Sequence, residues 1–111
     1  MLVIVSGVFR VTDAENLDLQ TDRVMDALLG AEATSDGRIT DSDVSATLSE
    51  GAVRISVVVD ADSIDEAQRI GVDVIESAIV SAGGNILNAP APTASASRFI
   101  EESRQAELVP A

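Results

Sequence analysis

The chain lacks most of the side chains that carry common enzyme chemistry. Its 111 residues include no cysteine, histidine, tryptophan or tyrosine, and its seven basic residues are all arginine, so lysine is missing too. No imidazole is present for proton transfer near neutral pH, and no thiolate or amine can serve as a nucleophile. The composition therefore predicts that the protein is not an enzyme. The alternative is catalysis by carboxylates, arginine, serine and backbone amides alone.

Aromatic side chains are scarce, and the net charge is strongly negative. Phe9 and Phe99 make up the whole aromatic share of 2%, which provides no stacking platform for nucleic-acid bases. A formal charge of −12 repels both phosphate backbones and anionic lipid headgroups. We therefore expect neither a nucleic-acid partner nor a membrane partner. The acidity indicates a solvated surface, with adaptation to high salt as the alternative.

Further absences concern ligands and location. Without cysteine there is no disulfide framework and no thiolate metal site. Residues 1–9 are apolar, but they lack the basic region and the small-residue cleavage site of a signal peptide. No apolar run reaches the length of a membrane span. The sequence predicts a cytoplasmic protein without a cofactor.

The chain does contain the aliphatic patterning of a mixed fold. The hydrophobic share of 46% comes mainly from Val, Ile, Leu and Ala, enough for one domain with a modest core. Alternation with a period of two indicates strands, and apolar spacings of three and four indicate helices. These patterns predict a strand over 2–11, a helix over 18–33, a hairpin with strands over 43–49 and 53–59, and a helix over 63–82.

The second predicted helix carries the clearest local signals. Ser63 followed by Glu66 forms a capping box at its start, and Gly83-Gly84 is a stop signal at its end. Gly71 lies in the interior of this helix, where glycine is unfavourable. Its presence there predicts a close approach of the helix to the sheet.

This order of elements predicts an α+β fold of the ferredoxin-like class, a two-layer sandwich with the order β-α-β-β-α. Right-handed crossovers place the first and third strands side by side and both helices on one face. We expect the domain to span residues 1–88, with an optional short fourth strand over 85–89. Residues 89–111 are predicted to be an Ala-, Pro- and Ser-rich linker followed by a short helix over 98–109 or a flexible tail.

The segment Ala52–Ser63 and the Ala- and Ile-rich helix after it, which ends in Ala-Gly-Gly, resemble small ferredoxin-like proteins of high-GC bacteria. The similarity covers about residues 40–84. It implies the sandwich architecture and assigns no activity.

The first predicted strand is apolar on both faces. Val3, Val5, Phe9 and Val11 alternate with Leu2, Ile4 and Val8. On the helix-free face of the sheet, an uncovered apolar surface would contain Leu2, Ile4, Val8 and Val58. We expect a homodimer that buries these four residues or pairs the first strand with its twin, with a monomer whose own tail covers them as the alternative. The C-terminal tail is also a candidate site for a protein partner.

Two acidic segments are candidates for metal binding, although no metal site is predicted. Residues 32–43 resemble an EF-hand or dockerin-type calcium loop, with Asp36 fifth, Gly37 sixth and Asp43 twelfth. The loop departs from that pattern in having Glu32 first and Asp43 in place of a bidentate glutamate. Asp60 and Asp62 belong to a second cluster, where acidic residues also complement a helix N-terminus.

The strand–helix order is also similar to that of ACT-type ligand-sensing domains, which dimerise through their sheets. Residues 12–17 correspond to the ligand loop of those domains, but they contain neither proline nor glycine. We expect a non-catalytic module that self-associates. The alternative is an ACT-like regulatory domain that binds a small molecule or a divalent cation.

Overall fold

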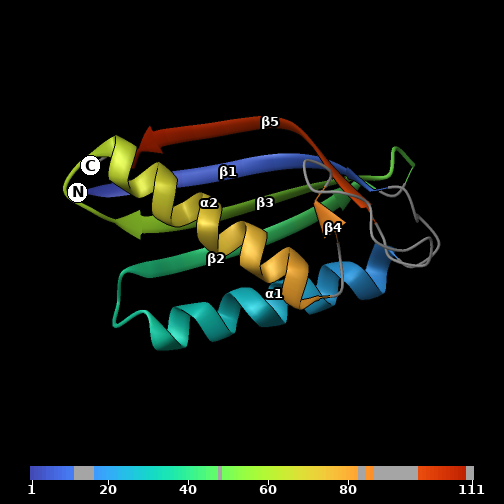
Figure 1. Ribbon diagram of the computed structural model, residues 1–111, viewed down its shortest axis with the longest axis horizontal. Coiled ribbons are helices and arrows are strands. Elements are labelled where there is room, and N and C mark those ends of the chain that lie inside the picture. Colours follow the sequence, from blue (N-terminus) through green and yellow to red (C-terminus); the bar gives the residue numbers. More distant parts are fainter. Residues whose placement is uncertain (12–16, 48, 83–84, 87–97, 110–111) are drawn as a thin grey trace.

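A computed structural model shows an α+β fold in which two helices pack on one face of a single sheet (Figure 1). The structure describes residues 1–11, 17–47, 49–82, 85–86 and 98–109. Its elements in chain order are β1 (Leu2–Val11), α1 (Leu17–Thr34), β2 (Ile39–Thr47), β3 (Ala52–Asp60), α2 (Ile64–Ser81), β4 (Asn85–Ile86) and β5 (Arg98–Leu108).

The strands lie in the order β2-β3-β1-β5-β4, with β1 in the centre (Figure 1). β1 pairs antiparallel with β3 on one side and with β5 on the other, and β2 pairs antiparallel with β3. β4 adds a two-residue parallel pairing at the start of β5. The predicted adjacency of the first and third strands is confirmed. Pairing of the first strand with its twin is wrong, because β5 occupies the other side of β1.

The prediction of a helix over 98–109 is wrong, because these residues form strand β5 and its continuation to Val109. Nearly the whole of β5 pairs with β1, from Phe99 opposite Val11 to Leu108 opposite Val3. Two strands therefore follow α2, so the element order differs from the expected β-α-β-β-α. The predicted fourth strand is present only as Asn85–Ile86. The rest of that segment and the predicted linker over 89–97 lie outside the described residues.

The core lies between the sheet and the two helices. The helix-facing side chains of β1 and β3 are buried, and Leu28 of α1 and Ile79 of α2 pack over them. Both phenylalanines belong to this core: the ring centroids of Phe9 and Phe99 are 6.1 Å apart in an edge-to-face arrangement. The contact joins β1 to β5 and explains why the last described strand is fixed to the first.

Within the described part of the chain, neither helix is long and apolar enough to cross a membrane.

Candidate interaction surface on the open face of the sheet

The face of the sheet opposite the helices is partly apolar. All four residues predicted to lie there do so, because they alternate along β1 and β3 with the buried core residues. Leu2 is 48% exposed, and Ile4 and Val8 are half-buried. Val58 is only 9% exposed, because the neighbouring strands flank it with Ile4 on β1 and Thr40 on β2.

Two further apolar residues share this face. Ala52 of β3 and Ile100 of β5 both lie opposite Arg10 of β1, and both are half-buried. Extending the period of two backwards from Val58 would have indicated Ala52. Ile100 could not be placed, since its segment was expected to be a helix.

Strand pairing arranges this face in transverse rows. One row is apolar at its centre, with Val58 beside Ile4. The next row is polar and consists of Asp43, Ser56, Ser6 and Gln105. Ser6 is buried at 5% exposure although its side chain lies on the helix-free side. The row after that combines Arg54 with Val8. The face therefore offers apolar area together with hydrogen-bonding groups.

Charges on this face are less one-sided than on the helices, although acidic residues still outnumber arginines: Arg10 and Arg54 lie there with Asp43, Asp60, Glu102 and Glu107. Arg10 bridges β1 and β5, where its Nε lies 2.8 Å from Oε1 of Glu102. Arg54 is exposed, and it has no ion-pair partner among the described residues. By contrast, α2 carries one arginine, Arg69, against four acidic residues, which are Asp65, Glu66, Asp73 and Glu76. The helical layer is therefore the more repulsive surface for another copy of this acidic chain.

A shallow hollow of about 460 Å³ opens on the same face where β1, β3 and β5 meet. It is lined by Val8, Arg10, Glu50, Ala52 and Glu102. The ion pair between Arg10 and Glu102 forms part of its wall. The hollow is open to solvent and therefore shows no enclosed small-molecule site.

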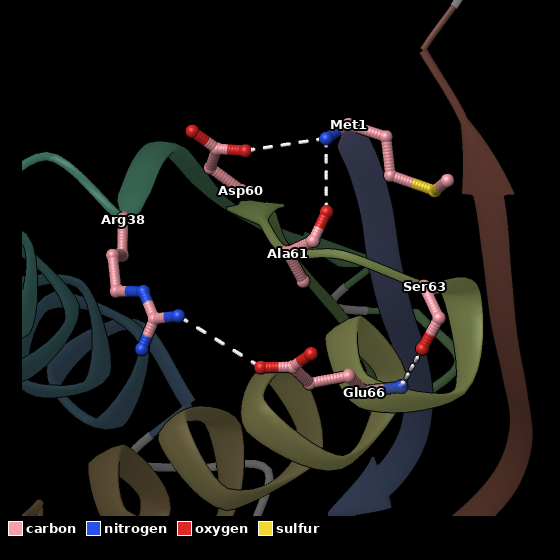
Figure 2. Close-up of polar contacts among 6 residues, drawn as sticks. All are labelled: Met1, Arg38, Asp60, Ala61, Ser63 and Glu66. Carbon is pink, nitrogen blue, oxygen red and sulfur yellow. Dashed lines mark hydrogen bonds and ion pairs between the residues drawn. The ribbon is translucent and has the colours of Figure 1, made fainter.

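The acidic corner at the start of β1 is engaged in structural contacts (Figure 2). The amino group of Met1 donates to the carbonyl oxygen of Ala61 at 2.8 Å and lies 3.4 Å from Oδ1 of Asp60. Glu66 donates its backbone N–H to Oγ of Ser63 at 3.1 Å, which confirms Ser63 as the N-cap of α2. The carboxylate of Glu66 lies 3.8 Å from the guanidinium of Arg38, so it does not complete the capping box.

The segment resembling a calcium loop is divided among three structures. Glu32 lies in the last turn of α1, and Asp36 and Gly37 form a turn in which both residues have positive φ. Asp43 lies in β2 on the open face of the sheet. Asp62 is exposed just before α2. Among the described residues, no group of three or more acidic side chains is arranged to hold a metal ion.

No protein-family model, curated protein or solved structure matches the chain in the comparisons made.

Proposed function

We propose that the protein is a non-catalytic, ferredoxin-like α+β module whose function is to assemble with itself through the open face of its sheet. The observation that carries this proposal is the row in which Ile4 and Val58 lie side by side, next to the half-exposed Leu2. Burying apolar area contributes about 25 cal/mol per Å², so covering this row favours association. β5 lies beside β1 on the side opposite β3, where the last strand of a ferredoxin-like sheet lies, and this position supports the ferredoxin-like assignment.

A second copy of the chain suits this surface better than an unrelated partner does. A two-fold axis parallel to the strands and between β1 and β3 would bring Ile4 of each copy onto Val58 of the other. The same operation would bring Ser6 onto Ser56, so that these two polar groups meet, whereas Leu2 and Val8 would meet Asp60 and Arg54 of the other copy. The mixed charges of this face oppose such packing less than the acidic helices would.

The test is a sedimentation-velocity series over a range of concentrations. The wild type should form a dimer, and the double variant I4T/V8T should dissociate at a concentration at least about tenfold higher. Threonine keeps the branched shape that suits a strand while placing hydroxyl groups in the interface.

The matched control is V80T, the same change at a 60% exposed valine on α2. It should leave the dimer unchanged. A wild type that stays monomeric at the highest concentration, or equal effects of I4T/V8T and V80T, would contradict the proposal.

A thermal-shift screen with Ca²⁺, Mg²⁺ and metabolites tests the regulatory alternative, because a ligand of the native state raises the melting temperature.

A further inference from the structure

The outer edge of β5 is a second surface, independent of the open face. β4 pairs with β5 only at Arg98 and Phe99. Among the described residues, no strand lies beside the remaining stretch, Ile100–Leu108 (Figure 1). Its outward N–H and C=O groups form the kind of edge that can pair with another strand.

The direction of these backbone groups follows from the register. Val109 donates its N–H to the carbonyl oxygen of Leu2, so at this residue the backbone points toward β1. The direction of the backbone N–H and C=O groups alternates from one residue to the next along a regular strand. The backbone N–H and C=O groups of Ser103 and Gln105 therefore also point toward β1, and those of Arg104 point away from β1, toward the free edge.

A β-bulge interrupts this alternation. Ser103 lies opposite Val8 and Glu101 lies opposite Phe9, which leaves Glu102 as the extra residue. Glu102 and Ser103 both lie on the open face, since Glu102 contacts Arg10 and Ser103 faces Val8.

Glu101, like Arg104, lies on the helix-facing side. Backbone chirality links the face of a side chain to the direction of its N–H group, so Glu101 also points outward. The two outward residues are three positions apart instead of the usual two.

That spacing selects the strand that can pair across the bulge. In a regular strand the outward residues recur every two positions, so such a strand cannot match Glu101 and Arg104 together. A strand with the same extra residue can do so. We propose that β5 pairs antiparallel with β5 of a second copy, with Glu101 of each copy opposite Arg104 of the other.

The side chains support this register. Glu101 and Arg104 already form an ion pair within one chain, at 2.9 Å, and both are partly buried. In the paired edges their four charges alternate in sign, and opposite charges directly across strands stabilise an antiparallel pair. Ile100 faces Gln105 of the second copy, and β4 limits the pairing at Phe99. Each matched pair lies on one face, so the two sheets continue with their helices on the same side.

The experiment uses two single variants of the full chain. E101R places like charges opposite each other in this register, and R104E does the same with the opposite sign. Each variant alone should weaken edge pairing at least about tenfold in sedimentation. An equimolar mixture of the two should recover it, because arginines of one variant then face glutamates of the other. Native mass spectrometry should show the mixed species in excess over either homomer.

The mixture separates pairing between copies from the ion pair within a chain, since that internal pair is lost in both variants. The controls are R69E and D73R on α2, which make the same two changes in charge at exposed positions. They should leave assembly unchanged, and circular dichroism should show all four variants folded. The edge pairing would be overturned if E101R and R104E each assemble like the wild type, or if their mixture does not regain the assembly that the single variants lose.

The outcome is distinguishable from failure of the open-face dimer. If both surfaces act, the wild type forms open assemblies larger than a dimer, because the two-fold axis between β1 and β3 does not meet the one beside β5. I4T/V8T and the edge variants then each reduce these assemblies to a different dimer. If only the edge acts, the edge variants are monomers and I4T/V8T has no effect. If only the open face acts, the reverse holds and the edge pairing is rejected.

Discussion

Gly71 is the residue at which α2 lies closest to the sheet. A Cβ atom at this position would lie 2.6 Å from Cβ of Val5 on β1, well inside normal contact. The glycine predicted from the sequence to permit close packing does so. Because Val5 is held in the central strand, neither side can move without disturbing other core contacts.

We expect G71A to destabilise the protein by about 1–3 kcal/mol, since overpacking outweighs the gain in helix propensity. G30A is the matched control, because Gly30 in α1 has nothing within 4 Å of an added Cβ. That variant should be more stable than the wild type, by up to about 1 kcal/mol. Urea unfolding monitored by circular dichroism measures both. If G71A and G30A changed the free energy of unfolding by similar amounts in the same direction, Gly71 would not be in tight contact with the sheet.

At the scale of elements, β5 shows why one strand escaped prediction. Its helix-facing residues change phase at the bulge: Phe99 and Glu101 are odd-numbered, whereas Arg104 and Ala106 are even-numbered. No period of two runs through the segment. Its glutamate, arginine, glutamine and alanine residues are also good helix formers. Pairing with β1 and burial of Phe99 overcome that local preference.

β1 and β3 were predictable because their patterns are unbroken, whereas β2 begins at Ile39, before the predicted strand over 43–49, and its register shifts between Thr40 and Asp43. β1 and β3 bury every second residue against the helices, and Gly51, with φ of 64°, forms the turn that joins β2 to β3. The same alternation indicated Leu2, Ile4, Val8 and Val58 on the open face. It could not indicate the edge of β5, which depends on a strand and a bulge that only the three-dimensional pairing reveals.

The assignment of β5 as a strand predicts opposite effects for one substitution in two places. Q105T, at an exposed residue of β5, should raise the free energy of unfolding by up to about 1 kcal/mol, since threonine suits a strand. Q68T on α2 should lower it by about 0.5 kcal/mol, since threonine disfavours a helix. Chemical denaturation of dilute samples measures both. Destabilisation by Q105T as large as that by Q68T would contradict the strand.

At the scale of the whole molecule, charge is the dominant surface property. The chain carries −12, and four ion pairs are present among the described residues, all of them at least partly exposed. Exposed pairs contribute little, about 0–1 kcal/mol each. Repulsion among the remaining carboxylates therefore opposes both folding and assembly.

Raising the ionic strength from about 0.01 M to 0.15 M shortens the Debye length from about 30 Å to 8 Å, which screens this repulsion. We expect the urea midpoint to rise and the open-face dimer to tighten over this range. Sodium chloride and choline chloride should act equally, because screening depends on ionic strength alone. A larger effect of sodium would point to a bound cation, and no change with either salt would contradict net repulsion.

The pairing of β1 with β5 also determines when folding can finish. Val3 lies opposite Leu108, so the central strand gains its second neighbour from the far end of the sequence. Contacts between such distant residues slow folding, because a long loop must close first. During synthesis on the ribosome, the side of β1 that pairs with β5 stays unpaired until β5 emerges. The nascent chain is thus most exposed to misassembly until β5 has been made.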